Sequence, residues 1–335
     1  MPVAATPSVA TTLSRAATRA ALAPSVHNTQ PWHFVVRHNY IEIWSDTSRQ
    51  LKVLDPRARQ LMISCGCAVF NACVAIAAAG FEPMVARFPD PLIPELLARI
   101  SLGDARDWVP IGGLDPAIDD RRTNRRAFAD EPVPASVIYD LVEAARSEFA
   151  QLIPITAPQL RTAVAQLSRH ADQVQAADPA YLAELLDWTT DDPRRNDGVQ
   201  AASVPYAGPM SVAHDGIPIR AFDVRGMGWL PSSSHSDADQ CLLLLAAADD
   251  GPESWLRTGE ALEHVWLELT RRGYAASPLN QLIEVPHTHE QLRATLQLDL
   301  HPQILLRVGL APNAVRTPRR PWGDVISGAA ASDVE

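Results

Sequence analysis

The chain has 335 residues, more than a single compact core usually holds, so we expect one large domain or two fused units. Hydrophobic residues make up 47% of it and charged residues 20%, which excludes an intrinsically disordered protein. The net charge of -10, with Lys52 as the single lysine, excludes a general nucleic-acid or anionic-membrane surface. An anion site must therefore be local and built from arginine.

The cysteines favour a reducing compartment, and the apolar segments favour a protein that contacts no membrane. Cys65, Cys67 and Cys73 lie close together on one expected helix, in a spacing unlike that of zinc sites. With Cys241 they are expected to be small buried hydrophobes. No export signal is visible, and the longest apolar stretch, residues 65–81, is interrupted by polar residues and glycine and is expected to be too short to span a bilayer. We expect a cytoplasmic protein that contacts no membrane.

The first hundred residues predict a helix, a hairpin and a second helix. Thr11 or Thr12 can cap the first helix, which Pro24 ends. Residues 32–36 and 40–44 predict a hairpin.

Residues 60–79 are apolar on nearly every side and predict a central buried helix, closed by Gly80 in a left-handed conformation. Residues 97–102 follow as a short strand or helix end. Glycines and prolines at 110–116 indicate a joint, where we place a domain boundary between residues 1–115 and 116–335.

The sequence of residues 116–335 predicts further helices and one long irregular stretch. The expected elements are helices entered at Pro134, spanning about 160–174 and spanning about 178–188, an apolar run at 241–248, a helix that ends at Gly273, and a buried strand at 303–308. Between them, residues of about 190–240 lack periodicity. An irregular stretch of this length is usually functional or disordered, and we expect a lid.

Two segments carry the candidate binding residues. Pro24 to Trp32 is a stiff polar loop that leads into a strand, suited to holding a ligand; alternatively, its polar side chains cap the neighbouring elements. The second segment is a cluster formed by Arg121, Arg122, Arg125 and Arg126, with Arg319 and Arg320 near the end of the chain. Guanidinium groups gathered in space need a multiply charged anion such as a phosphate, whereas a solvated surface would pair them with nearby acids.

The chain also contains a candidate internal duplication. The same number of positions separates Gly66 from Gly80 and Gly259 from Gly273, and similar helix and strand segments flank both pairs in the same order. Chance similarity is the alternative, because glycine is common at helix ends. The polar loop occurs only in the first copy and the arginine cluster only in the second. Two copies that each hold half a site predict one composite site.

The two binding segments carry a family resemblance. Ala23-Pro24-Ser25-x-x-Asn28-x-Gln30-Pro31-Trp32 resembles the flavin-contacting signature of the nitroreductase family. Arg121-Arg122-Thr123-x-Arg125-x-x-Phe128 is similar to that family's phosphate-binding motif, in which serine usually stands at the position of Thr123. Residues 55–66, 255–262, 307–309 and 318–321 resemble the Acg-like branch, tandem nitroreductase-fold proteins of mycobacteria and other actinobacteria that are often linked to dormancy.

The resemblance implies an α+β fold of two fused nitroreductase-like copies, each a mostly antiparallel sheet flanked by helices, which form a pseudo-dimer in one chain. It implies one FMN per chain between the copies. Arginines 121, 122, 125, 319 and 320 would hold the phosphate together with Thr123, and the flavin ring and ribityl chain would contact Pro24, Ser25, Asn28, Gln30, Ser277 and Leu279.

The resemblance implies an FMN oxidoreductase that passes hydride from NAD(P)H to a nitroaromatic, quinone or similar acceptor, with no side chain as acid, base or nucleophile. A lid over the flavin would instead make the protein an FMN store or sensor without turnover. Two further alternatives are a metal enzyme, using His287-x-His289 with Glu290 or using His27 and His33, and a flavin-free interaction protein.

Overall fold

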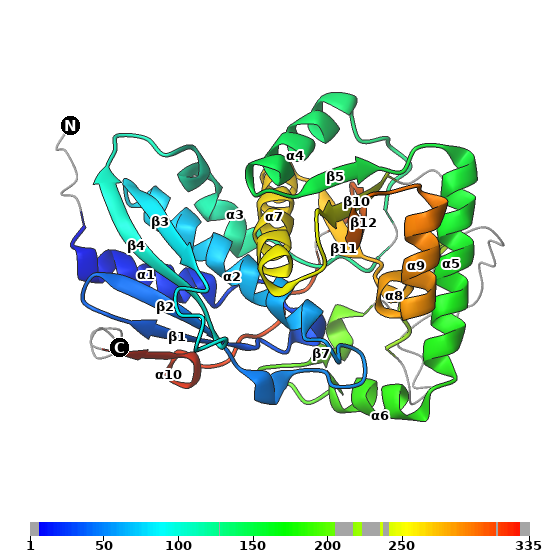
Figure 1. Cartoon of the computed structure of the whole chain (residues 1–335), viewed down its shortest axis with the longest axis horizontal. Coiled ribbons are helices and arrows are strands. Elements are labelled where there is room, and N and C mark those ends of the chain that lie inside the picture. Colours follow the sequence, from blue (N-terminus) through cyan, green and yellow to red (C-terminus); the bar gives the residue numbers. More distant parts are fainter. Residues whose placement is uncertain are drawn as a thin grey trace.

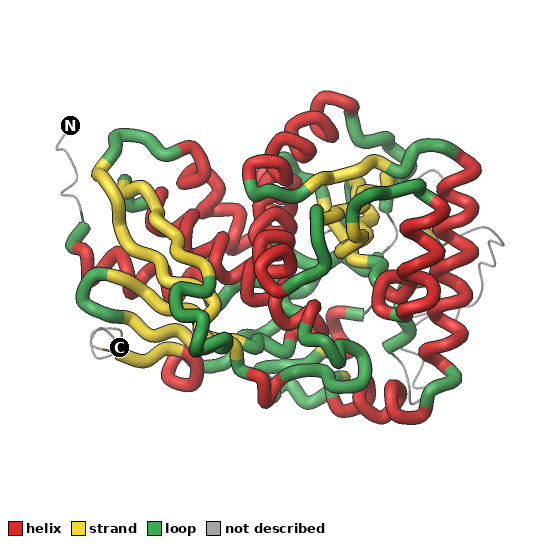
Figure 2. The backbone as a smooth tube through the Cα atoms, in the orientation of Figure 1, coloured by secondary structure: helices red, strands yellow, loops and turns green. Residues whose placement is uncertain are grey.

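The computed structural model describes residues 7–126, 128–204, 217–222, 235–236, 241–312 and 314–328. The fold is α+β. Two sheets lie in separate lobes, with a pair of long helices between them (Figure 1, Figure 2).

The first lobe largely follows the sequence expectations. Its elements are α1 (Val9–Ala20), β1 (Trp32–Val36), β2 (Tyr40–Ser45), α2 (Arg59–Ala78), β3 (Phe81–Arg87), β4 (Leu96–Ala105) and α3 (Asp115–Asp120). The hairpin and the buried helix are confirmed, and Gly80 has the expected positive φ, 85°. The cap of α1 is neither Thr11 nor Thr12 but Ser8, whose side chain accepts a hydrogen bond from the Thr11 N–H. The expected joint is a 3-10 turn that runs into α3.

The second lobe contains the expected helices, and its sheet contains two strands that the sequence does not predict. Its elements are α4 (Ala135–Ser147), β5 (Gln151–Pro154), α5 (Pro158–Ala176), α6 (Pro179–Asp187), β10 (Cys241–Ala247), α7 (Pro252–Arg271), β11 (Ala275–Pro278), α8 (Gln281–Glu284), α9 (Pro286–Thr295) and β12 (His301–Gly309). The short pairs β6 (Thr189–Thr190) with β7 (Val199–Gln200) and β8 (Ile217–Pro218) with β9 (His235–Ser236) belong to the irregular stretch. The unpredicted strands of the sheet are β5 and β11, which have four residues each and are too short to show periodicity.

The two sheets share one strand order. The first runs β1-β2-β4-β3 and the second β5-β10-β12-β11, and in each the long central helix follows the second strand in chain order. The second lobe also has α5 and α6 between β5 and β10, and α8 and α9 between β11 and β12. All these neighbours are antiparallel. The end of the chain crosses back to the first lobe, where α10 (Trp322–Val325) precedes β13 (Ile326–Gly328), and β13 pairs with β1 in parallel. Residues of the second predicted half thus extend the first sheet.

The central helices α2 and α7 cross at two glycines. A Cβ atom built on Gly66 would lie 2.0 Å from the Leu256 carbonyl oxygen, and one built on Gly259 would lie 2.0 Å from the Ile63 carbonyl oxygen. Each glycine therefore approaches the backbone of the opposite helix, and the contact is reciprocal. Only glycine permits so close a crossing, and this crossing fixes the distance between the lobes.

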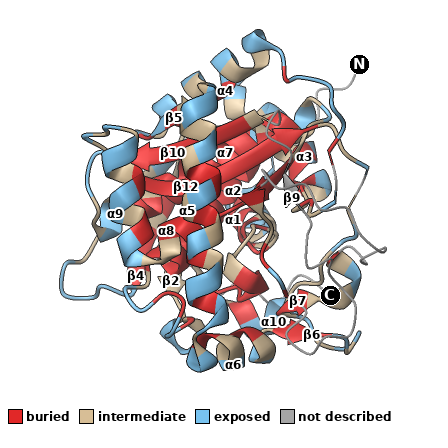
Figure 3. Ribbon diagram, turned by 90° about the vertical axis from the view of Figure 1, so that its right-hand side faces the viewer, coloured by how far each residue is buried: buried red, intermediate tan, exposed pale blue. Residues whose placement is uncertain are grey.

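The helix pair lies in the interior of the protein. Figure 3 shows buried residues along α2, α7, β10 and β12, with exposed residues on the outer faces of α5, α6 and α9. By length and composition α2 could cross a membrane, which corrects the expectation that the apolar stretch was too short. However, 89% of its apolar window is buried inside the protein, and this burial accounts for its hydropathy.

We expect Gly259→Ala to destabilise the protein by about 3 kcal/mol, because the added methyl group forces the helices apart. Gly323→Ala is the matched control, since nothing lies within 4 Å of a Cβ atom at that position. Urea denaturation followed by circular dichroism measures both changes. Equal stability of the two variants would contradict the tight crossing.

Candidate functional site

Two adjoining cavities lie between the loop of the first lobe and the arginines that precede the second lobe. One has a volume of about 270 Å³ and the other about 110 Å³. Pro24, Ser25, Thr123 and Arg125 line both, so the cavities share a wall. The loop and the arginines, about a hundred residues apart in the chain, therefore meet at one place.

The larger cavity is lined by arginines. Arg121, Arg122, Arg125, Arg316 and Arg319 all contribute to it. Of the nearby acids, Asp119 also lines the cavity, but its carboxylate pairs with Arg19 outside the cluster. Burial, followed by the neighbouring charges of Arg121 and Arg122, lowers the pKa of Arg319 to about 9.

Burial and the charge of Arg220 likewise lower the pKa of Arg125 to about 10. Burial is the main cause of both shifts and a neighbouring positive charge adds to each, so a bound polyanion would favour the charged form of both guanidinium groups.

The smaller cavity has an apolar floor and a polar rim. Its floor comes mainly from the two central helices and β12: Ile63, Cys67, Leu262, Trp266 and Ile304. Its rim includes Gln60, Ser64, Ser277, Asn280 and Glu284, with Arg220 and Phe222 from the irregular stretch. A planar apolar group with polar edges suits this lining.

His27 also lines the smaller cavity and is buried. Burial, with smaller contributions from Arg220 and Arg125, lowers its pKa well below the usual value, so the imidazole is neutral at pH 7. Among the described residues, neither ring nitrogen has a hydrogen-bond partner, and the ring lies edge-on to Phe222. A ligand in this cavity would meet an unpartnered imidazole.

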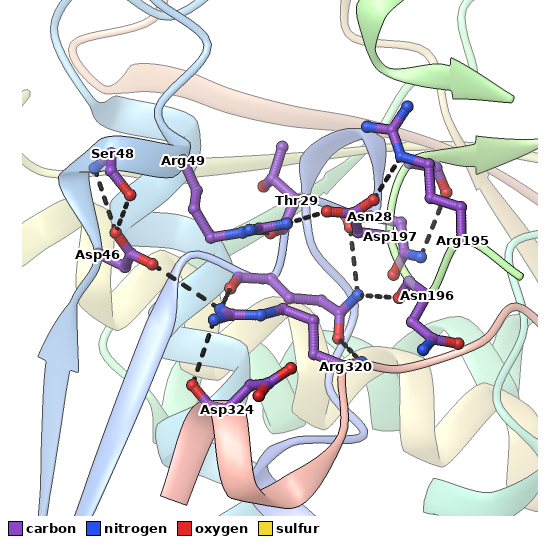
Figure 4. Close-up of polar contacts among 12 residues, drawn as sticks. Asn28, Thr29, Asp46, Ser48, Arg49, Arg195, Asn196, Asp197, Arg320 and Asp324 are labelled. Atoms are coloured by element: carbon purple, nitrogen blue, oxygen red, sulfur yellow. Dashed lines mark hydrogen bonds and ion pairs between the residues drawn. The ribbon is translucent and has the colours of Figure 1, made fainter.

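The loop backbone is strained. His27, Asn28 and Gln30 have φ values of 46°, 55° and 50°, although none of them is glycine. Neighbouring segments hold this conformation (Figure 4). The side chain of Gln30 donates to the Asn196 carbonyl oxygen at 2.8 Å and accepts from the Arg320 N–H at 2.8 Å. The cavity wall thus depends on the irregular stretch and on the end of the chain.

A second set of polar contacts anchors the loop from its other side. Asp197 is ion-paired with Arg49 and with Arg195, and the Nε of Arg49 donates to the Thr29 carbonyl oxygen (Figure 4). Asn28 donates to the Gly198 carbonyl oxygen at 3.2 Å. Residues 195–198 are therefore docked on the loop through both side chains and backbone.

Most of the predicted binding residues line the cavities: Pro24, Ser25, Asn28, Arg121, Arg122, Thr123, Arg125, Ser277 and Arg319. Gln30, Leu279 and Arg320 do not. Gln30 and Arg320 brace the loop, whereas Leu279 is buried in a hydrophobic cluster beneath β12.

Sequence reasoning missed several lining residues, among them Arg220, Phe222, Trp266 and Arg316. No local sequence pattern indicates Arg220, because its position depends on an ion pair with Glu284 and a hydrogen bond to Tyr181. Arg316 lies beside the predicted Arg319, and that proximity could have indicated it.

The histidines of the metal alternative do not form a cluster. His287 and His289 lie on helix α9, and the ring of His287 lies edge-on to that of His170. Within the described ranges, no group of three His, Cys, Asp or Glu residues could hold a metal ion.

The predicted lid is described only in part. Residues 205–216, 223–234 and 237–240 lie outside the described residues. Of the remainder, residues 195–198 contact the loop, and Ile219, Arg220 and Phe222 line the smaller cavity.

Comparison with known proteins identifies the family. The model named Nitroreductase family matches residues 118–310. The chain belongs to the nitroreductase family, which confirms the resemblance of its two motifs. Its relatives include two proteins of Mycobacterium tuberculosis H37Rv. One, named "Putative NAD(P)H nitroreductase Rv3131", is 34% identical over 325 residues, which are 95% of this chain and 91% of the relative.

The second relative, named "Putative NAD(P)H nitroreductase acg", is 32% identical over 315 residues, 90% of this chain and 91% of the relative. Among solved structures, a nitroreductase with bound FMN from Desulfitobacterium hafniense aligns with a TM-score of 0.39 at 12% identity. That alignment covers 64% of this chain and 96% of the other.

We expect Gln30→Leu to lower the free energy of unfolding by about 2 kcal/mol, because it removes both hydrogen bonds of a buried side chain and leaves the Arg320 N–H and the Asn196 carbonyl oxygen without this partner. Gln166→Leu, on the exposed face of α5, should change stability by less than about 0.5 kcal/mol. Chemical denaturation of both variants measures the difference. A Gln30 variant as stable as the control would show that these bonds do not hold the loop.

Proposed function

We propose that the protein is an FMN-binding oxidoreductase of the nitroreductase type, with one FMN per chain between its two halves. The observation that carries this proposal is the pair of adjoining cavities, one lined by arginines and one with an apolar floor and a polar rim. FMN has the matching parts, a phosphate at one end and a planar ring with polar edges at the other. The names of the Mycobacterium tuberculosis relatives support the same activity.

The arginines of the larger cavity are suited to binding a phosphate. Arg319 reaches the backbone carbonyl oxygens of Leu22 and Ala23 at 3.0 Å, which fixes its guanidinium beside Arg121 and Arg122. Its Nε has no hydrogen-bond partner among the described residues. A phosphate would accept from this donor and offset the mutual repulsion of the arginines.

We further propose that the two halves are copies of one unit and act as a dimer does. The shared strand order and the reciprocal contact of Gly66 with Gly259 support this, because a two-fold interface repeats each contact with the partners exchanged. Each copy contributes the part of the site that the other lacks. A single chain would then contain both parts of the binding site without a second subunit.

Bound FMN would accept hydride from NAD(P)H and pass it to a nitroaromatic, quinone or similar acceptor. The residues of this chain bind and position. The arginines hold the phosphate end, the strained loop forms one wall beside the ring, and Trp266 with Leu262 excludes water from the floor.

A second candidate function is FMN storage or sensing without turnover. The observation that favours it is the position of residues 217–222, of which Ile219, Arg220 and Phe222 line the smaller cavity and Arg220 is ion-paired with Glu284. If this segment does not move, the acceptor and the nicotinamide have no access to the ring.

To separate the two functions, we would measure FMN per chain and then mix the loaded protein with NADPH and with NADH without oxygen. We expect one FMN per chain and loss of the 450 nm flavin absorbance within seconds. Two FMN per chain would contradict the composite site. Absorbance that persists with both nicotinamides would favour storage.

We expect Arg319→Met to weaken FMN binding about 100-fold, because a charge-assisted contact to phosphate is worth about 3 kcal/mol. Riboflavin, which has no phosphate, should bind the variant and the parent protein equally. Arg146→Met is the control, since that side chain is 78% exposed on α4 and far from the cavities in sequence. Fluorescence titration gives the affinities, and an equal loss of riboflavin binding would show a structural defect.

A further inference from the structure

A buried carboxylate lies directly beneath the arginine-lined cavity. Glu263 projects from the central helix α7 and is fully buried. Its Oε1 lies 3.3 Å from the Nε of Arg121, which lines the cavity. The guanidinium of Arg121 stacks 5.0 Å from the ring of Trp266. Arg121 thus lies between a buried negative charge and the place where an anion would bind.

The surroundings of Glu263 leave its charge poorly compensated. The groups that face it are the cations Arg121 and Arg319 and, from α2, the side chains of Asn71 and Cys67. Within the described part of the chain, neither carboxylate oxygen accepts a close hydrogen bond, and the Asn71 amide stabilises the charged carboxylate less than Arg121 does. One turn earlier on α7, Glu260 is also buried, but it is satisfied by a two-point contact with Arg87. The negative charge of Glu263 is therefore compensated mainly by Arg121.

Burial raises the pKa of Glu263 to about 7, and the charge of Arg121 opposes this rise. An anion bound to Arg121 from the cavity side would compete for the same guanidinium and add negative potential near the carboxylate. Both effects favour the protonated acid, which removes the like charge. The reverse also holds: when pH rises through 7, the ionised carboxylate neutralises Arg121 and weakens the hold on an anion.

We propose that Glu263 is a positioning residue that holds Arg121 at the cavity wall and takes up a proton when a phosphate-bearing ligand binds there. The inference rests on the proposed function for the identity of that ligand. No covalent step is involved. The proton comes from solvent and remains on the carboxylate while the ligand is bound.

The decisive measurement is calorimetric titration of the full-length, flavin-free chain with FMN at pH 7.5, in two buffers of different ionisation enthalpy. We expect a net uptake of about half a proton per FMN, because a pKa raised from about 7 by the ligand is partly titrated at this pH. FMN affinity should fall about sixfold from pH 6.5 to 8.5 if the ligand raises the pKa from about 7 by one unit. Binding without proton uptake would overturn the proposal.

The variant Glu263→Gln isolates the carboxylate. Its FMN affinity should be constant within about twofold from pH 6.5 to 8.5, and at pH 8.5 it should bind FMN at least as tightly as the parent protein. Glu253→Gln, an exposed position on the same helix, should keep the parental pH dependence. Loss of FMN at every pH in Glu263→Gln would assign the residue a purely structural role and contradict proton uptake.

Sulfate provides a probe whose charge does not change in this pH range, which excludes titration of the FMN phosphate as the cause. We expect its stabilisation of the flavin-free chain, followed by thermal unfolding, to weaken from pH 6.5 to 8.5 in the parent protein only. A chain that binds sulfate with this pH dependence but does not bind FMN would refute the proposed function and leave the role of Glu263 standing. A chain that binds FMN with no proton uptake would do the opposite.

Discussion

The crossing of α2 and α7 at Gly66 and Gly259 is the contact on which the site depends. Because no side chain separates the helices there, the loop of the first lobe and the arginines of the second reach a common pair of cavities. The same helices supply the apolar floor, through Cys67 on one and Trp266 on the other. If the helices crossed at a greater distance, the loop and the arginines would move apart, and the apolar floor of the smaller cavity would open as well.

The end of the chain completes the link between the lobes. After β12 the backbone carries Arg316 and Arg319 to the larger cavity, and then adds β13 to the edge of the first sheet. On the way, the Arg320 N–H bonds to Gln30. One segment therefore delivers two cations, braces the strained loop and ties the second half to the first sheet. This combination explains how like charges can be held together: their backbone is fixed by pairing elsewhere.

Much of this arrangement could be predicted from the sequence. Apolar periodicity and glycine placement identified α2, α7 and the strand β12, and the two motifs located the loop and the arginines. The features that the sequence did not predict are those that depend on tertiary contacts. The strand β5 has four residues and is defined by its pairing with β10. The approach of Arg220 to the smaller cavity depends on Glu284, more than sixty positions away. Neither leaves a local pattern.

The buried charges give the site an asymmetry that its shape alone does not. Among the described residues that line the larger cavity, positive charge exceeds negative charge, and the carboxylate of Glu263 beneath it has a pKa raised by burial to about 7, so a proton can neutralise it near pH 7. At the smaller cavity, Arg220 is matched by Glu284 and the neutral His27 adds no charge, which leaves Arg125, on the wall shared with the larger cavity, as the excess cation. A ligand with one anionic end and one neutral planar end would therefore bind in a single orientation. Electrostatics would select that orientation before the shape of either cavity does.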